Sequence, residues 1–508
     1  MRVRTAIAAA GASALLLWTA SPAVGWGWLA WIGLVPAAAV ALTATGRPGR
    51  LAVPLAYALY LELLFVPALP FGLADGQWGD PALPVLVGGS PVLPVALVLI
   101  PLLGVALYAI DLGRPWPRDR RPPAALMIVA PAVVWTGLEV LRVKLDPGAG
   151  WGPLYLTQAE LPGGSLALLA GPWLITLAIV AVNYGLALAL VRRSAAGLLA
   201  PAAAAIAILA TAALEAEADS EAAPVVVAAV QPGYDTSEEE RPQLRHFKRG
   251  SHDLAALDVI ADLAAPTLRA AVSGAELVVW PEATMFVDPR SDRRVRRELV
   301  RLSRQSGAVL VVPYFLRYAG LRSEALAVIP DAEGRPRPAA RLSDSRSKQR
   351  AMWFLGERGG GRPASEPLAA AGIELGLLPG LDGLDPALSA GLAEAGADLL
   401  VAPTHDWEAL AVQQRAAARL AARSSGLPLV RADWRYGSAA YDRRGRVLAD
   451  RGTTLRRTTL VGEIKPGPGG TPYARVGDLL AWSALAMGAL ALLWARRPTR
   501  FLADPSDG

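Results

Sequence analysis

A carboxylate stands directly after a short apolar run, in the sequence Trp280-Pro281-Glu282. Residues 276–279 before it have the pattern of a buried strand, and the proline stiffens the backbone that follows. A carboxyl group at the end of a buried strand is poorly solvated, which raises its pKa and suits it to act as a general base. An ordinary strand that ends on a glutamate has the same pattern, so this motif alone makes Glu282 a candidate base and does not distinguish it from a structural glutamate.

The supply of nucleophiles is narrow, because the chain has no cysteine and three histidines. The lack of cysteine excludes disulfides, thiolate metal ligands and a thiol nucleophile. His405 lies between Thr404 and Asp406, but consecutive side chains rarely face one another as a triad requires, so it is interpreted as a loop residue. No metal-ligand spacing and no glycine-rich phosphate loop is found, and no cofactor is expected.

Strands and helices alternate around these residues. This order is typical of an α/β layered domain with helices over sheets. The predicted strands are 225–230, 277–280, 309–314, 399–402 and 428–432, and the predicted helices are 253–268, 293–306, 386–395 and 409–424.

The rest of the chain is apolar. Of the 508 residues, 53% are hydrophobic and 19% are charged, which is below the roughly 25% charge of soluble proteins. Apolar stretches of membrane-spanning length predict seven helices and one more after the α/β domain. Their expected ranges are 6–26, 28–45, 51–71, 85–110, 124–141, 166–190, 198–214 and 476–494.

Arginine and lysine in the short loops predict the orientation in the membrane, because these residues mark the cytoplasmic side. They cluster before the first span and after the second, fourth, sixth and last spans, as in Arg192 and Arg193. The loops after the first and third spans have none. Both termini are therefore expected in the cytoplasm, with the α/β domain outside. Much of the positive excess behind the net charge of +6 lies in these loops and not on one basic face, so a nucleic-acid partner is not indicated.

The order of segments and several motifs resemble the apolipoprotein N-acyltransferases, membrane enzymes with a nitrilase-like domain between helices. The resemblance covers nearly the whole chain. The motifs that carry it are Trp135 to Arg142, Gly150-Trp151, Gln158, Leu168 to Gly171, Val182-Asn183, Gln231, Glu276 to Thr284, Gly396 to Val401, Asp406-Trp407, Arg415, Arg419, Gly426 to Arg431 and Gly437 to Asp442.

The resemblance implies a multi-pass membrane region of about seven plus one helices and an extracytoplasmic αββα-sandwich domain. It divides the chain into residues 1–215 (membrane helices), 216–475 (nitrilase-like domain), 476–496 (final helix) and 497–508 (cytoplasmic tail). It also implies a Glu-Lys-Cys triad, in which the cysteine takes an acyl chain from a phospholipid and passes it to the amino-terminal cysteine of a lipoprotein.

Carried over by position, the triad is incomplete. Glu282 matches the base. The nucleophile lies 16 residues before the match to Gly396, and that position is Gly380, with Asp382 two residues later as an acidic binding position. The turn Leu355-Gly356-Glu357 places Gln349 at the oxyanion lysine, with Lys348 one residue away. A one-residue slip reverses a strand's side chains, and a bulge would restore Lys348 to the site.

Two functions are carried forward. The leading hypothesis is a catalytically degenerate acyltransferase-like membrane protein that binds phospholipid, a diacylated lipoprotein or an active acyltransferase, with Glu357, Asp382 and Trp407 as binding residues. The alternative is an active acyltransferase that N-acylates lipoproteins from phospholipid by a cysteine-independent route, with Glu282 deprotonating the acceptor amine. Glu139 and Arg142, near the outer end of the fifth span, are a candidate polar site facing a lipid headgroup, because ionisable groups inside membrane segments usually have a role. Snorkelling of Arg142 toward the interface explains that residue equally well.

Overall fold

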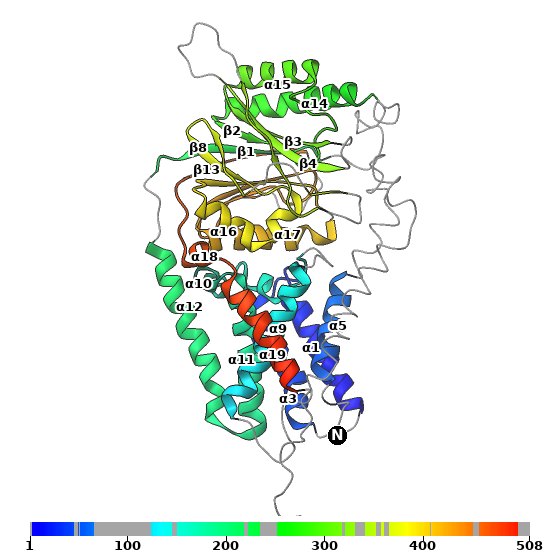
Figure 1. Cartoon of the computed structure of the whole chain (residues 1–508), viewed down its shortest axis with the longest axis vertical. Helices are drawn as coiled ribbons and strands as arrows, with labels where there is room; N and C mark the ends of the chain where they lie inside the picture. Colours follow the sequence, from blue (N-terminus) through cyan, green and yellow to red (C-terminus); the bar gives the residue numbers. More distant parts are fainter. Residues whose placement is uncertain are drawn as a thin grey trace, which may run out of the picture.

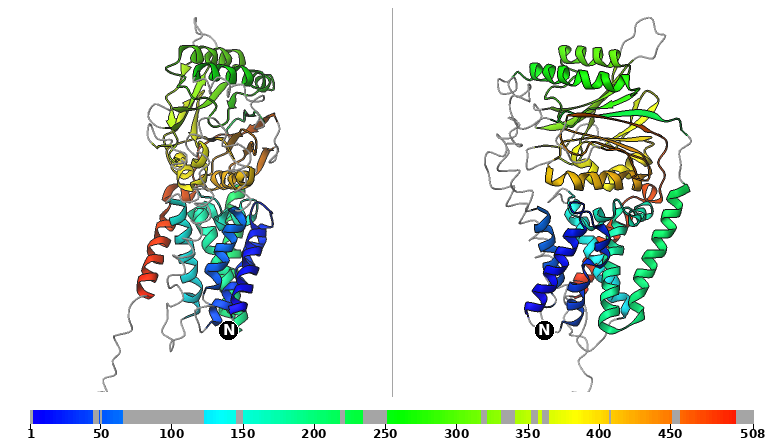
Figure 2. Two further views of the ribbon diagram at one scale, coloured as in Figure 1. Left: turned by 90° about the vertical axis from the view of Figure 1, so that its right-hand side faces the viewer. Right: turned by 180° about the vertical axis from the view of Figure 1, so that it is seen from behind.

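The computed structural model of the chain has a bundle of helices below and a layered α/β domain above (Figure 1). The structure describes residues 3–44, 49, 51–65, 123–144, 150–217, 222–233, 251–316, 321–330, 341–351, 357–359, 365–406, 408–450 and 457–495. The chain enters and leaves the upper domain through the bundle, since the final helix, red in Figure 2, returns into the bundle after the domain.

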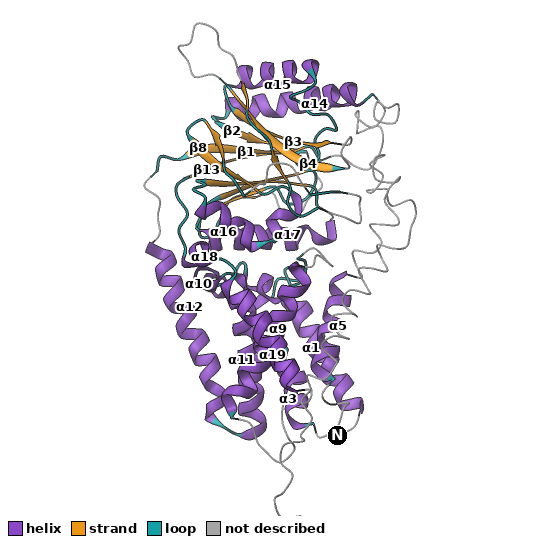
Figure 3. Cartoon of the chain, viewed as in Figure 1, coloured by secondary structure: helices purple, strands orange, loops and turns teal. Residues whose placement is uncertain are grey.

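The bundle is formed by apolar helices and short 3-10 turns (purple in Figure 3). The long helix α9 packs between α11 and the C-terminal α19. The elements are α1 (Val3–Ala20), η1 (Gly27–Leu29), α2 (Ala30–Gly33), α3 (Val35–Thr43), α5 (Ala52–Phe65), α9 (Ala124–Lys144), η3 (Leu154–Gln158), η4 (Pro162–Leu166), α10 (Ala167–Ala170), α11 (Pro172–Arg192), η5 (Ala195–Leu198), α12 (Leu199–Glu217), α18 (Pro472–Val476) and α19 (Leu479–Ala495).

A described helix corresponds to each predicted span except the fourth, 85–110, which lies outside the described residues. Four helical segments are long and apolar enough to cross a membrane: Val3–Ala20, Ala124–Lys144, Pro172–Arg192 and Ala195–Glu215. Gly27–Thr43, Ala52–Leu64 and Leu479–Leu490 are apolar but shorter. The last span begins later than predicted, because Gly477, with φ +57, ends α18 before α19 starts.

Two β-sheets stack face to face in the upper domain. In the described residues one sheet has the order β13-β1-β2-β3-β4-β5, with β6 also on β4, and the other has the order β12-β11-β10-β9-β8-β7. The strands are β1 (Val225–Gln231), β2 (Leu277–Val279), β3 (Val309–Leu316), β4 (Arg322–Ile329), β5 (Arg341–Leu342), β6 (Arg346–Ser347), β7 (Leu368–Ala370), β8 (Ile373–Leu377), β9 (Leu399–Thr404), β10 (Leu429–Asp433), β11 (Ala439–Tyr441), β12 (Val447–Asp450) and β13 (Thr458–Ile464).

Helices cover both outer faces of the sheet pair. Above lie α14 (His252–Val272) and α15 (Arg293–Ser306), and below lie α16 (Pro386–Glu394) and α17 (Glu408–Ser425) (Figure 3). Successive side chains of β1 point to opposite faces of the sheet: Val227 packs between the two sheets, and Ala228 packs under α14 and α15. The expected αββα class is confirmed by these layers.

Helix α17 joins the two parts of the molecule. Leu410 and Leu420 belong to the apolar core of the bundle, whereas Ala421 packs under the sheet. At its end, the Arg423 guanidinium binds both carboxylate oxygens of Glu215 on α12, at 2.8 and 2.9 Å. The domain is thus seated on the bundle by apolar packing and a buried ion pair.

Glu139 and Arg142, the candidate headgroup site, both have hydrogen-bond partners within the bundle. The Glu139 carboxylate accepts hydrogen bonds from Trp135, Thr176 and the Leu154 backbone amide. Arg142 donates to the Tyr57 hydroxyl and the Trp151 carbonyl. The bonds to the Leu154 amide and the Trp151 carbonyl hold the segment 150–158 against α9, because buried polar groups require partners in an apolar environment.

Candidate functional site

Glu282 lies at the junction of the two sheets. It follows β2 by three residues, and its amide donates to the carbonyl of Thr404 at the end of β9, in the other sheet (3.3 Å). The side chain is buried, with 4% of the residue exposed. The next residue, Ala283, has φ +58, a conformation that costs free energy in any residue with a Cβ. The tight turn thus aims Glu282 into the space between the strand ends.

Lys348 meets Glu282 there. Its Nζ lies 3.0 Å from Glu282 Oε1 and 2.9 Å from Glu357 Oε2, and all three side chains are at most 5% exposed. The Ser323 hydroxyl donates a further hydrogen bond to Glu282 Oε1, at 3.2 Å. The structure therefore brings together three of the residues singled out in the sequence. Ser323 and Trp434, whose indole donates to the Glu282 carbonyl, were not predicted.

The uncertain register at Lys348 and Gln349 is resolved by a strand that ends early. β6 ends at Ser347, so the alternation of side chains between the two faces of a strand no longer fixes the direction of the Lys348 side chain. The Lys348 amide still donates to the Ser323 carbonyl (2.9 Å). Its side chain turns into the site. The Gln349 side chain instead donates to the Ser347 carbonyl at 2.8 Å.

The three buried charged groups, Glu282, Lys348 and Glu357, shift one another's pKa values because they lie in contact. Burial raises the pKa of the Glu282 carboxyl and Glu357 adds to this, while Lys348 opposes it. Burial by itself would lower the pKa of Lys348, but Glu282 and Glu357 outweigh it and raise that pKa. Lys348 is thus held as an ammonium between two acidic groups, beside a carboxyl that takes up a proton more readily than in water.

Gly380 lies against the Glu282 carboxylate. It begins the 3-10 turn η7 (Gly380–Leu384) with φ +53, and a Cβ placed on it would stand 2.4 Å from Glu282 Oε2. The match to the nucleophile position, made by counting residues, therefore leads to a backbone position that touches the candidate base. The space that a side chain would need at Gly380 is occupied by the Glu282 carboxylate itself.

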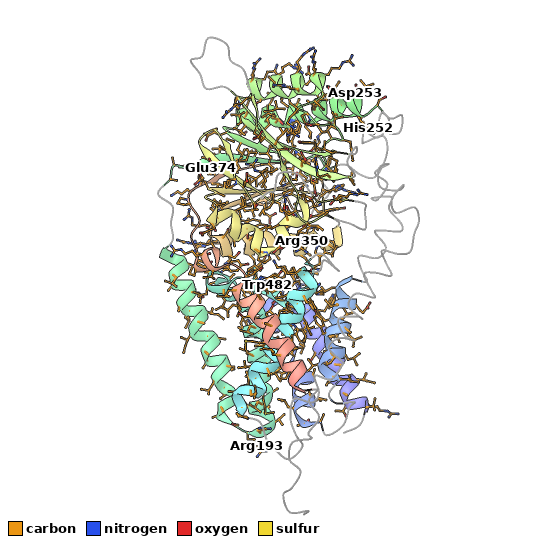
Figure 4. All side chains as sticks on the ribbon, viewed as in Figure 1. Arg193, His252, Asp253, Arg350, Glu374 and Trp482 are labelled. Atoms are coloured by element: carbon orange, nitrogen blue, oxygen red, sulfur yellow. The ribbon has the colours of Figure 1, made fainter. Side chains whose placement is uncertain are left out.

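Asp382 anchors the segment that carries Lys348. Its buried carboxylate accepts hydrogen bonds from the backbone amides of Gln349, at 3.1 and 2.9 Å, and Arg350, at 2.7 Å. Arg350 in turn lies at the base of the domain, over the bundle, and pairs with Asp385 at 3.1 Å (Figure 4). Burial raises the pKa of Asp382 to about 7 despite these amides.

This pKa predicts a pH dependence of stability. Because the folded-state pKa of about 7 lies above the ordinary value near 4, stability from the protonated Asp382 is full below about pH 4 and is lost as pH rises through 7. Between those values the free energy of unfolding is expected to fall by roughly 1 kcal/mol per pH unit. Asp382→Asn should flatten this slope, measured by thermal unfolding from pH 5 to pH 8. Parallel profiles for the variant and the wild type would contradict it.

The residues around His405 do not form a triad. The Thr404 hydroxyl donates to Asp433 (3.0 Å), Asp406 pairs with Arg431, and the His405 ring lies 6.0 Å from that of Trp434. The interpretation of His405 as a loop residue thus agrees with its surroundings. Trp407 lies outside the described residues. Among the residues the structure describes, no group of three or more His, Asp or Glu side chains is placed to hold a metal ion.

Fold and site together define a membrane-embedded αββα-sandwich protein with a buried Glu-Lys-Glu cluster between its strand ends. Residues 13–185 match the family model described as the apolipoprotein N-acyltransferase N-terminal domain. The resemblance stated from the sequence is thereby confirmed, and the chain is an apolipoprotein N-acyltransferase-like membrane protein. Comparison with curated protein sequences gives no significant match.

Solved structures of nitrilase-superfamily proteins are similar to about half of this chain. A mutant amidase from Nesterenkonia AN1 has 18% identity over 50% of this chain and 93% of its own, with a TM-score of 0.36. A carbon-nitrogen hydrolase from Helicobacter pylori has 15% identity over 56% and 99%, with a TM-score of 0.37. Nit3 from Saccharomyces cerevisiae has 15% identity over 52% and 98%, with a TM-score of 0.39.

Proposed function

We propose that this protein is a catalytically degenerate acyltransferase-like protein, which binds phospholipid or a diacylated lipoprotein without transferring an acyl chain. The observation that carries the proposal is Gly380. It occupies the position matched to the nucleophile, touches the Glu282 carboxylate and has no side chain to attack an acyl ester. The chain has no cysteine elsewhere to replace it.

A second function is favoured by the contacts of Lys348. A base and a cation are still placed 3.0 Å apart in a buried site, which are the groups that direct attack by an amine would require. In that mechanism the Glu282 carboxylate takes a proton from the acceptor amine, and the amine nitrogen bonds to the acyl carbon. The ester bond between the acyl carbon and the glycerol oxygen breaks, protonated Glu282 returns its proton to that oxygen, and the lysophospholipid leaves. Lys348 stabilises the oxyanion that develops on the acyl oxygen.

One assay separates the two functions. The purified full-length protein is incubated with phospholipid and a diacylated lipopeptide, and the lipopeptide mass is measured. We expect no third acyl chain, while a fluorescent form of the lipopeptide is retained by both the wild type and Glu282→Gln. A cysteine-containing acyltransferase run alongside validates the substrates. A third acyl chain that appears with the wild type and disappears with Glu282→Gln would establish the direct mechanism instead.

The proposed topology places both termini in the cytoplasm and the αββα domain outside. It is supported by the position of Arg193 and of the N-terminus, which both lie at the end of the bundle away from the domain (Figures 1 and 4).

Because the chain has no cysteine, a single introduced thiol reports its own side of the membrane. Ser273→Cys on the domain and Ala195→Cys beside Arg193 are both at exposed positions. In intact cells a membrane-impermeant maleimide is expected to label the first and not the second. The reverse pattern would invert the topology.

A further inference from the structure

Residues 346–350 carry Lys348, and different parts of the protein hold them on either side of it. Before Lys348, the short strand β6 pairs with β4, and the Ser347 hydroxyl donates to the Glu324 carboxylate at 3.2 Å. After Lys348, the next two backbone amides donate to the Asp382 carboxylate of η7. The position of Lys348 therefore depends on β4 on one side and on η7 on the other.

The turn η7 belongs both to the site and to the membrane bundle. Its Gly380 lies against the Glu282 carboxylate, whereas its Leu381 and Leu384 are buried in the apolar core of the bundle. A Cβ placed on Gly150, in the segment after α9, would stand 3.1 Å from the Leu384 Cβ. Since packed cores resist displacement, η7 is expected to follow the ends of the bundle helices that face the domain.

A chain of ion pairs links α9 to the segment 346–350. Lys144 is the last residue of α9, and its Nζ lies 2.8 Å from Asp385 Oδ1 and 2.7 Å from Asp478 Oδ2, just before α19. The other Asp385 oxygen lies 3.1 Å from Arg350 Nη1. The Arg350 guanidinium also donates to the carbonyl of the residue before Lys144. Asp385 thus lies between a cation of the bundle and a cation of the segment that carries Lys348.

Access to Glu282 requires an element around it to move, because Glu282 and Lys348 are at most 5% exposed. These elements differ in how firmly they are held. β4 is paired with β3 along most of its length, and η7 is packed into the bundle. The segment 346–350 has two residues of strand pairing, and the part after Lys348 is held by polar contacts, which include those of Asp382 and Asp385. Movement of this segment therefore disrupts the least packing.

We propose that Lys144 and Asp385 are positioning residues that keep the segment 346–350 closed over Glu282. The end of a membrane helix then controls access to the site. A shift of α9 away from α16 breaks the Lys144–Asp385 pair, loosens the segment and lets Lys348 leave Glu282. Because the two movements are coupled, a ligand that favours one of them favours the other. The proposal does not depend on whether the site binds a substrate or reacts with it.

The test compares two isosteric variants of the full-length protein in detergent micelles. Asp385→Asn removes the charge that Lys144 and Arg350 share, while asparagine still caps the N-terminus of α16. Glu215→Gln is the matched control, because it breaks a different ion pair between the bundle and the domain, the one with Arg423. The two carboxylate side chains have the same exposed fraction, 12%. A general loosening of the junction would affect both variants alike.

The measurement is acetylation of the Lys348 amine by acetic anhydride, followed by mass spectrometry of the digested protein. The amine reacts only when it is exposed and has lost its proton, so the rate reports how often the segment opens. We expect Asp385→Asn to raise the rate at least about tenfold and Glu215→Gln to raise it no more than about twofold. Lys144→Met should also raise it, and Lys144→Arg, which keeps the cation, should stay near the wild type.

All rates are measured at a temperature at which circular dichroism shows each variant to be folded. Equal rates for the wild type, Asp385→Asn and Lys144→Met would overturn the proposal. Equal increases for Asp385→Asn and Glu215→Gln would overturn it too, because the effect would then be a loosening of the whole junction. If Asp385→Asn does not fold, the comparison of Lys144→Met with Glu215→Gln decides the question in the same way.

Discussion

Gly380→Ala is expected to destabilise the protein by roughly 2–5 kcal/mol, although it adds a single methyl group. About 1–2 kcal/mol comes from the left-handed backbone conformation, φ +53, which disfavours residues with a Cβ. A further 1–3 kcal/mol, roughly, comes from the overlap with the Glu282 carboxylate, 2.4 Å from the new atom. Thermal unfolding of the purified protein measures the sum.

Gly383→Ala is the matched control. It lies in the same 3-10 turn, and a Cβ on it meets no atom within 4 Å. Its melting temperature is expected to stay near that of the wild type. The overlap is isolated by combining Gly380→Ala with Glu282→Ala, since the smaller side chain removes the clash and leaves only the backbone cost. Equal losses for Gly380→Ala and Gly383→Ala would show that Glu282 does not fill the space beside Gly380.

The same geometry predicts the result of restoring a thiol. Gly380→Cys would place its sulfur next to the Glu282 carboxylate only if that carboxylate first moves away from Lys348. We therefore expect no acyl-enzyme from this substitution alone.

Lys348→Met is expected to cost about 3–5 kcal/mol near neutral pH, because it leaves two buried carboxylates without their shared cation. The direction with pH follows from Glu282. Its folded-state pKa is already raised by burial, and loss of Lys348 removes the main opposing charge. In the variant, the contribution of protonated Glu282 to the free energy of unfolding is fully present below the ordinary glutamate pKa, about 4.3, and is lost as pH rises. The deficit of the variant should shrink on acidification.

Gln349→Ala is the control for this variant. Its side chain makes one hydrogen bond, to the Ser347 carbonyl, so the expected cost is about 1 kcal/mol. Denaturation curves of both variants between pH 4 and pH 8 are the measurement. A larger loss at Gln349 than at Lys348 would contradict the placement of Lys348 in the site.

The sequence predicted the parts of this site that depend on long, regular elements. The run 276–279 identified the strand before Glu282. Counting back from Gly396 led to Gly380, and the structure has only the 3-10 turn η7 and the helix α16 between these two residues. Lys348 was left open, since β6 has two residues and no alternation can be read from so short a strand. Ser323 was missed because β4 has the sequence RSEALAVI, whose Glu, Ala and Leu favour a helix, and pairing with β3 overrides that preference.

Other contacts had no local signal at all. The Asp382 carboxylate binds backbone amides more than thirty positions away along the chain, and main-chain donors leave no mark on residue type. Glu139 and Arg142 were a candidate headgroup site because ionisable groups inside membrane segments usually have a role, and their partners in η3, α11 and α5 could not be read from the sequence. The identity of a buried ionisable residue predicts that it has partners, and the fold decides which they are.

The helix α17 has a consequence for how the protein folds. It supplies Leu410 and Leu420 to the core of the bundle and Ala421 to the core beneath the sheet. Each of the two cores is therefore complete only when α17 is packed against both parts of the protein. A fragment of residues 222–464 would therefore expose an apolar helix face and is expected to aggregate rather than behave as a free domain. Calorimetry of the intact chain should show one cooperative transition for both parts, because neither can melt without unpacking the helix that they share.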